Sequence, residues 1–264
     1  MRIAGTMAVV TGASRGIGAA TARALAARGA TVLLLARDAA RLEQVRGEIE
    51  TLGGQAEVHA ADLSEAGQVD RVFDALEAQG VRPEIVVNGA GAGRWLYTEE
   101  TEPAEAAAMM GAPYFAAFFV TRRCLPAMLA ARRGHIVNLN SPVVRGGWPS
   151  AAGYAAARYA LYGWTEALRY DLHGTGVGVT SVIASQTASD YWANNPGAWE
   201  RRPRIADVLR VVTPEEVARA VLAGIEGNQR EVVLPFMLRV FFAANLAAPW
   251  LVEWLVARTG HQRP

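Results

Sequence analysis

The stretch Thr11-Gly12-Ala13-Ser14-Arg15-Gly16-Ile17-Gly18 lies between an apolar run, Met7 to Val10, and an alanine-rich stretch with helical spacing. This order predicts a strand that enters a helix through a glycine-rich turn. The three glycines allow a tight turn and a close approach to a ligand, while the free amides of the next helix attract negative charge. The turn therefore predicts a phosphate site. A turn that only joins a strand to a helix is the alternative at this point.

Short β-branched runs alternate with longer amphipathic stretches along the chain. The runs predicted as strands are Val32–Ala36, Ala56–Ala60, Glu84–Asn88, His135–Leu139, Val177–Ile183 and Glu231–Leu234. Predicted helices include Ala39–Leu52, Glu65–Gln79, Tyr154–His173 and Pro214–Glu226. This alternation predicts an α/β fold with one doubly wound, parallel, Rossmann-type sheet, whose ligands lie at the carboxyl ends of the strands. We interpret residues 1–264 as a single domain.

Composition narrows the possible partners. A net charge of +1 gives no reason to expect nucleic acid. The single cysteine, Cys124, excludes an internal disulfide, which fits a reducing cytoplasm. The chain reaches its first predicted strand at once, so we expect no signal peptide and a cytoplasmic location. We predict no metal site. Every basic residue is an arginine.

Two segments break the strand–helix rhythm. Residues 190–204 carry several aromatic residues without clean periodicity, which indicates a lid-like segment over a pocket; aromatic residues that fix a loop to the core are the alternative. Residues 235–264 form an apolar C-terminal extension. Polar residues interrupt it, so we predict no transmembrane segment. A packed or subunit-bridging tail and attachment to a membrane or partner surface both stay open.

Five motifs together resemble the short-chain dehydrogenase/reductase family. They are TGASRGIG at 11–18, Asp62-Leu63, Asn88-Gly89-Ala90-Gly91, the run from His135 to Ser141, and Tyr154, thirteen residues after Ser141. Each motif is weak alone, but their order and spacing are specific. The resemblance covers Met7 to about Leu234. It implies a dinucleotide-binding domain, a small-molecule substrate, and a homodimer or homotetramer.

The resemblance also implies a set of cofactor-binding residues. Those around the phosphates and ribose would be Gly12, Ser14, Arg15, Gly16, Ile17 and Gly18; those near the adenosine would be Asp62, Leu63, Asn88, Ala90 and Gly91; Tyr154 and Arg158 would lie nearer the nicotinamide. Gly89 replaces the second asparagine of the family motif.

Arg37 bears on the choice of nucleotide. It stands where NADP-preferring members place a base, and Ala36 cannot accept hydrogen bonds from a free 2′-hydroxyl as an acidic residue would. Arg15 and Arg37 could clamp a 2′-phosphate with bidentate hydrogen bonds. We therefore expect NADP(H) as the cofactor. An ordinary solvated arginine before a helix is the alternative for Arg37.

The resemblance makes Tyr154 the proton donor to a carbonyl, or the acceptor from an alcohol, and makes Ser141 the holder of the substrate oxygen. The chemistry supports these roles, because negative charge grows on that oxygen as hydride arrives at carbon, and a positioned phenol can neutralise it.

The sequence departs from the family pattern at three places. Arg158 replaces the lysine, Pro113 replaces the asparagine of the central helix, and Ser185-Gln186 replaces a Pro-Gly pair after the sixth strand. A guanidinium keeps a positive charge and hydrogen-bond donors but does not readily release a proton. Pro113 should also kink its helix.

Three hypotheses follow. The first is an NADP(H)-dependent oxidoreductase that interconverts a ketone and a secondary alcohol in a largely apolar substrate. The second is a non-redox enzyme (an isomerase, dehydratase or cyclase) that uses Tyr154 and Ser141. The third is a catalytically silent nucleotide-binding protein. Candidates for the substrate pocket, with core packing as the alternative for each, are Trp95, Tyr97, Trp148, Tyr191 and Trp192.

Overall fold

The computed structural model describes residues 1–91, 93–189, 191, 193, 195 and 197–263. Within them, one parallel sheet has the strand order β3-β2-β1-β4-β5-β6-β7. The strands are β1 Met7–Thr11, β2 Thr31–Ala36, β3 Gln55–Ala60, β4 Ile85–Asn88, β5 Gly134–Asn140, β6 Val177–Ala184 and β7 Glu231–Leu234. The predicted α/β fold is confirmed. The strand order reverses between β1 and β4, which is where open α/β sheets bind ligands.

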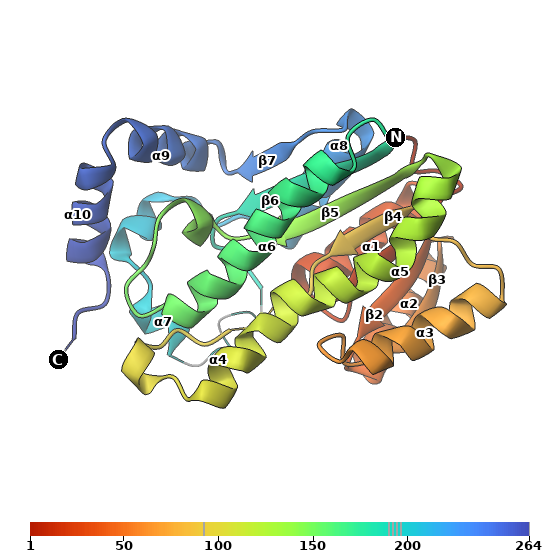
Figure 1. The fold of residues 1–264 in the computed structure, drawn as a ribbon, viewed down its shortest axis with the longest axis horizontal. Helices are drawn as coiled ribbons and strands as arrows, with labels where there is room; N and C mark the ends of the chain where they lie inside the picture. Colours follow the sequence, from red (N-terminus) through yellow and green to blue (C-terminus); the bar gives the residue numbers. More distant parts are fainter. Residues whose placement is uncertain (92, 190, 192, 194, 196, 264) are drawn as a thin grey trace.

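Helices cover both faces of the sheet (Figure 1). They are α1 Gly16–Ala27, α2 Ala39–Thr51, α3 Ala66–Ala78, α4 Pro103–Met110, α5 Ala116–Ala131, α6 Ala152–Asp171, α7 Ala198–Arg201, α8 Pro214–Gly227, α9 Phe236–Ala247 and α10 Pro249–Thr259. Helices α1, α2 and α8 pack on one face, and α3, α5 and α6 on the other. Both faces of the central strands are therefore buried, which explains their almost continuous apolar sequence.

Helix α8 begins where its sequence predicts. The hydroxyl of Thr213 accepts a hydrogen bond from the amide of Glu216, and the Glu216 carboxylate accepts one from the amide of Thr213. Pro214 occupies the first helical position, where its missing N–H costs nothing. These contacts satisfy amides that would otherwise have no partner at the helix start.

Pro113 separates α4 from α5. The chain between them, Gly111–Phe115, forms a wide irregular turn, and Ala112 has non-helical angles of φ −135° and ψ 100°. Proline has no N–H to donate to the preceding turn, and its ring clashes with the carbonyl four residues earlier. The predicted kink is confirmed.

The C-terminal extension folds back as two helices beyond β7. Among the residues that the structure describes, no single helix is long and apolar enough to cross a membrane, although α9 and α10 pass that test as a pair bent by 118°. Leu238, Val252 and Val256 are buried against the body of the protein. One face of this pair is therefore packed, and its other face is solvent-exposed.

Candidate active site

The glycine-rich turn leaves no room for side chains. Gly12 has φ +69°, and a Cβ there would lie 3.0 Å from the backbone of Ala90. A Cβ on Gly18 would lie 2.1 Å from the carbonyl oxygen of Gly12. Helix α1 begins at Gly16, so its free amides face the space above the turn. The turn is thus a cradle for an anionic group at a helix N-terminus.

A cavity of about 1060 Å³ begins at this turn and follows the carboxyl ends of the strands. Its volume lies at the upper end of the range for small-molecule sites, roughly 300–1,000 Å³. The predicted site residues that line it are Gly12, Ser14, Arg15, Gly16, Ile17, Gly18, Arg37, Asp62, Leu63, Ala90, Gly91, Trp95, Ser141, Trp148, Tyr154, Arg158 and Tyr191. Residues from distant parts of the sequence therefore meet in one cavity.

Asp62 lies at the same end of the cavity as Arg37. Its Oδ1 accepts hydrogen bonds from the Ser64 hydroxyl at 2.6 Å and from the Ser64 amide at 3.0 Å. These bonds hold the pKa of the Asp62 carboxyl below its usual range, and the nearby Arg37 charge adds to the effect. Asp62 is therefore an oriented, ionised acceptor.

Asn88 does not line the cavity, contrary to the prediction. Its Nδ2 donates to the Thr121 hydroxyl at 3.1 Å and to Oδ1 of Asn138 at 2.8 Å, and Nδ2 of Asn138 donates to Thr165 at 2.8 Å. This buried chain joins β4, α5, β5 and α6 behind the cavity. The side chain turns inward, where these partners accept both hydrogen bonds of its amide nitrogen, so only the backbone after Asn88 reaches the cavity wall.

Ser141, Tyr154 and Arg158 meet at the other end of the cavity. Ser141 follows β5 directly, Tyr154 lies in the first turn of α6, and Arg158 lies one turn later. All three are buried. The Tyr154 ring centroid is 5.7 Å from that of Trp95 and 6.4 Å from that of Tyr191. The Tyr154 ring is therefore packed among aromatic side chains at this end of the cavity.

Arg158 occupies the space between the phenol and the sheet. Its guanidinium carbon lies 5.3 Å from the Tyr154 ring centroid, and its Nη1 donates to the Leu139 carbonyl at 3.1 Å. A Cβ on Gly91 would lie 2.5 Å from its Nη2, so a larger residue there would displace the guanidinium. Its buried Nε has no hydrogen-bond partner among the described residues.

Asn140 is a positioning residue that the sequence reasoning missed. Its Oδ1 accepts from the Ser141 amide at 2.8 Å, and its Nδ2 donates to the Arg158 carbonyl at 3.3 Å. Asn140 therefore holds the end of β5 against α6. The available signal was its place directly before Ser141, within a motif already singled out.

Aromatic residues form the wall beside Tyr154. The Trp95 and Trp148 ring centroids are 5.2 Å apart, and Trp95 Nε1 donates to the Tyr191 hydroxyl at 3.2 Å. Burial raises the pKa of the Tyr191 phenol well above its usual value. Asn195 accepts from the Gly93 amide at 3.2 Å and donates to the Tyr191 carbonyl at 2.7 Å. The described part of the 190–204 segment is thus tied to the loop after β4.

One predicted aromatic residue of the substrate pocket, Tyr97, differs from the structure, and another, Trp192, lies outside the described residues. Tyr97 does not line the cavity, because its hydroxyl lies 3.0 Å from both Nδ1 and the carbonyl of His261. Trp199 is exposed beneath the Arg202 guanidinium, 3.7 Å from its ring centroid, and does not line the cavity either.

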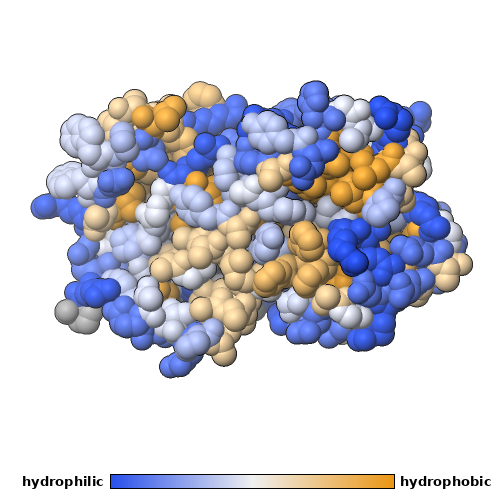
Figure 2. Space-filling model, viewed as in Figure 1, coloured by the Kyte–Doolittle hydropathy of each residue, from blue (hydrophilic) through white to orange (hydrophobic). Residues whose placement is uncertain are grey.

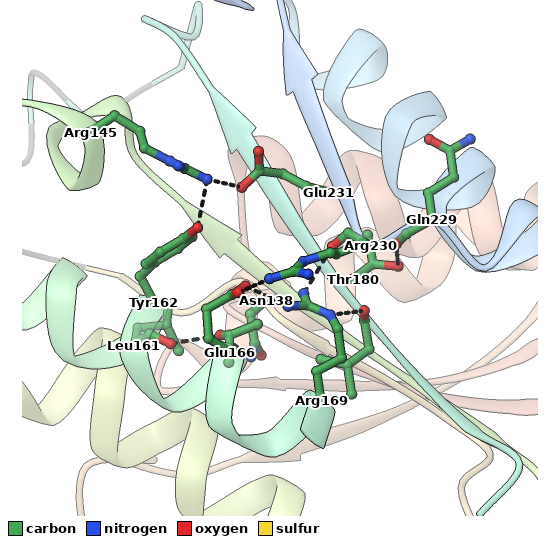
Figure 3. Close-up of polar contacts among 12 residues, drawn as sticks. Asn138, Arg145, Leu161, Tyr162, Glu166, Arg169, Thr180, Gln229, Arg230 and Glu231 are labelled. Carbon is green, nitrogen blue, oxygen red and sulfur yellow. Dashed lines mark hydrogen bonds and ion pairs between the residues drawn. The ribbon is translucent and has the colours of Figure 1, made fainter. Parts of the chain in front are cut away.

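Charged side chains connect the loop that follows Ser141 to α6 and β7 (Figure 3). Arg145, four residues after Ser141, donates to the Tyr162 hydroxyl at 2.6 Å and to Glu231 at 2.9 Å. Farther along α6, Glu166 pairs with both Arg169 and Arg230. The loop after β5 is therefore fixed to α6 and β7 by contacts between residues far apart in the sequence.

The protein belongs to the short-chain dehydrogenase family, whose model matches residues 6–198. The predicted family is confirmed.

A 3-oxoacyl-acyl-carrier-protein reductase of a Synechocystis species is 32% identical over 81% of this chain and 87% of its own. A ketoacyl reductase of a Nostoc species is 28% identical over 88% of this chain and 79% of its own. A solved metagenomic short-chain oxidoreductase in complex with NADP is 33% identical, with a TM-score of 0.74 over 89% of this chain and 98% of that one.

Proposed function

We propose that this protein is an NADP(H)-dependent oxidoreductase that interconverts a ketone and a secondary alcohol in a largely apolar substrate. The observation that carries the proposal is the single cavity that joins the glycine cradle and Arg37 at one end to Ser141 and Tyr154 at the other. Assembly as a homodimer or homotetramer, a cytoplasmic location and a single domain over residues 1–264 stay predictions.

The cradle and its surroundings suit a dinucleotide. The glycine turn would hold the pyrophosphate, Asp62 would accept from the adenine amino group, and Arg37 with Arg15 would bind a 2′-phosphate. The similar metagenomic short-chain oxidoreductase was solved with NADP, and a similar alcohol dehydrogenase of Thermococcus sibiricus, 26% identical with a TM-score of 0.75, was solved with 5-hydroxy-NADP. Both support this assignment. The cofactor, when bound, would supply or accept the hydride.

The residues at the other end would handle the proton. The Ser141 hydroxyl would donate a hydrogen bond to the substrate oxygen, and Tyr154 would transfer its proton there as negative charge develops. The Arg158 guanidinium keeps its positive charge at any working pH, and its carbon lies 5.3 Å from the centroid of the Tyr154 ring. Arg158 can thus supply the charge that a lysine would.

Proton resupply is the step that Arg158 would weaken. A guanidinium does not release its proton readily, so the proton that Tyr154 gives up must return by another route. This gap favours a second candidate function, non-redox acid catalysis by Tyr154 and Ser141. The third hypothesis, a catalytically silent nucleotide-binding protein, is also compatible with the glycine-rich turn.

An NADPH-oxidation screen over apolar ketones tests the proposal. Tyr154→Phe should lower turnover at least about a hundredfold, the low end of general-acid contributions, because it removes the transferable proton. Tyr159→Phe is the matched control on the exposed face of the same helix and should leave turnover unchanged.

Arg158→Lys distinguishes the candidates with the same assay. For a reductase it should maintain or raise the rate, because lysine restores a transferable proton. For a non-redox enzyme, product forms without NADPH consumption and Arg158→Lys brings no redox gain. A Tyr154→Phe protein as active as its parent would contradict both enzyme hypotheses.

A further inference from the structure

The corner formed by α9 and α10 carries a concentration of exposed apolar side chains. Leu246 is 87% exposed, Phe236 73%, Trp250 70% and Trp254 54%. Met237, Val240 and Leu251 are exposed as well. Figure 2 shows apolar side chains over the α9 end of the molecule, at the upper left. We call residues 236–254 the apolar corner.

The inner face of this corner is anchored. Leu238 is fully buried, and Phe241 and Phe242 pack against the cluster that contains Trp95 and Tyr154. Nδ2 of Asn245 donates to the Arg145 carbonyl, in the loop after β5. The exposed outer face therefore belongs to a helix, α9, that is held in place against the aromatic residues of the active site.

Charge is distributed unevenly over the extension. Between Arg239 and Glu253 the sequence contains no charged residue, and residues 235–264 hold three arginines against one glutamate. The Arg258 guanidinium lies 5.4 Å from the Trp254 ring centroid. Tryptophan rings and arginines beside an apolar surface are typical of helices that lie in the membrane interface, where anionic headgroups attract the arginines.

The corner is also close to the aromatic end of the cavity. Thr259 accepts a hydrogen bond from the Ile205 amide, next to Ala206, which lines the cavity. Gly260 packs so closely on Pro149, beside the cavity residue Trp148, that a Cβ would lie 2.6 Å from the proline ring. A surface that bound this corner would therefore lie near the aromatic wall.

We propose that the apolar corner docks this protein on an anionic lipid bilayer. The corner inserts its exposed side chains into the interface, and Arg258, beside Trp254, contacts the headgroups. Two short apolar helices bent by 118° can lie together in the interface of a bilayer without crossing it. Docking would bring the aromatic end of the cavity close to substrates dissolved in lipid. The docking itself does not depend on the proposed oxidoreductase activity.

Vesicle co-sedimentation tests the proposal. The unmodified protein should bind phosphatidylcholine vesicles that contain phosphatidylglycerol, and bind pure phosphatidylcholine vesicles more weakly. Leu246→Glu should lower the vesicle partition coefficient at least about tenfold, equivalent to about 1.4 kcal/mol. The matched control is Leu52→Glu, at an exposed leucine (79%) just after α2, which should bind as the parent does. NADPH titration of both variants checks that each remains folded.

Vesicles with brominated acyl chains test which face docks. They should quench the tryptophan fluorescence of the parent, and the Trp250→Phe, Trp254→Phe double variant should still sediment but lose most of the quenching. Failure of the parent to bind anionic vesicles, or equal loss in Leu246→Glu and Leu52→Glu, would overturn the proposal. So would a self-association that Leu246→Glu abolishes in sedimentation velocity without any vesicle binding, because the occupant would then be a second copy.

Discussion

We propose that the choice of nucleotide depends most on Arg37. It lines the cavity directly after β2, where Ala36 offers no acidic acceptor for a 2′-hydroxyl, and its charge acts on Asp62. A bidentate arginine–phosphate contact is charge-assisted and therefore strong.

We predict that NADPH binds at least about tenfold more tightly than NADH, a difference of about 1.4 kcal/mol. Arg37→Asp should remove or reverse this preference, because a carboxylate repels the 2′-phosphate and accepts from a free 2′-hydroxyl. Titration calorimetry of both nucleotides measures the effect, with Arg82→Asp as a control outside the cavity lining. Equal affinities of the unmodified protein for NADPH and NADH would contradict the binding of a 2′-phosphate by Arg37 and Arg15.

At the scale of elements, the described part of the 190–204 segment is joined to the loop after β4 by hydrogen bonds. Asn195 is buried and forms two hydrogen bonds there, and Tyr191 shares a wall with Tyr154. Loops that cover a reacting group commonly exclude water and retain the substrate.

We predict that NADPH with a turned-over ketone slows proteolysis within residues 190–204. Asn195→Ala should speed that cleavage and raise the KM for the ketone, because it removes the hydrogen bond from the Gly93 amide in the loop after β4 and the one to the Tyr191 carbonyl within the segment. Mass spectrometry of timed digests locates the cut, and Gln44→Ala, at an exposed position in the middle of α2, serves as the control. If saturating ligands leave the cleavage unchanged, the alternative interpretation is favoured, in which the aromatic residues only fix this loop to the core.

Local patterns predicted the elements better than the orientation of single side chains. Glu231–Leu234 is a strand with the predicted bounds, and α8 begins at Pro214, because alternation and capping act over a few residues. Tyr97 instead contacts His261, 164 positions away, and Asn88 turns toward Thr121 and Asn138. Such contacts depend on tertiary folding, which a local pattern does not contain.

At the scale of the whole molecule, β5 carries a titratable group into the core. His135 is buried, its Nε2 lies 2.8 Å from the Thr180 hydroxyl, and Thr180 donates its own proton to the Gln229 carbonyl at 2.6 Å. The neutral ring with the proton on Nε2 therefore satisfies this contact. A Cβ on Gly178 would lie 2.5 Å from Nδ1, so the other nitrogen faces backbone rather than water.

We predict that this histidine makes the fold acid-sensitive. Burial lowers the pKa of His135 from 6.5 to about 4, so between these values the unfolded chain binds the proton and the folded chain does not. The free energy of unfolding should therefore fall as pH drops from about 6.5 toward 4, by up to about 3 kcal/mol, since each pKa unit is worth 1.36 kcal/mol. Urea unfolding at pH 7 and pH 5 measures this loss.

His135→Gln should be less stable at pH 7 but lose less stability on acidification, whereas His173→Gln, at an exposed position, should retain the parent's pH dependence. Equal losses in the His135→Gln variant and its parent would mean that other groups cause the acid sensitivity.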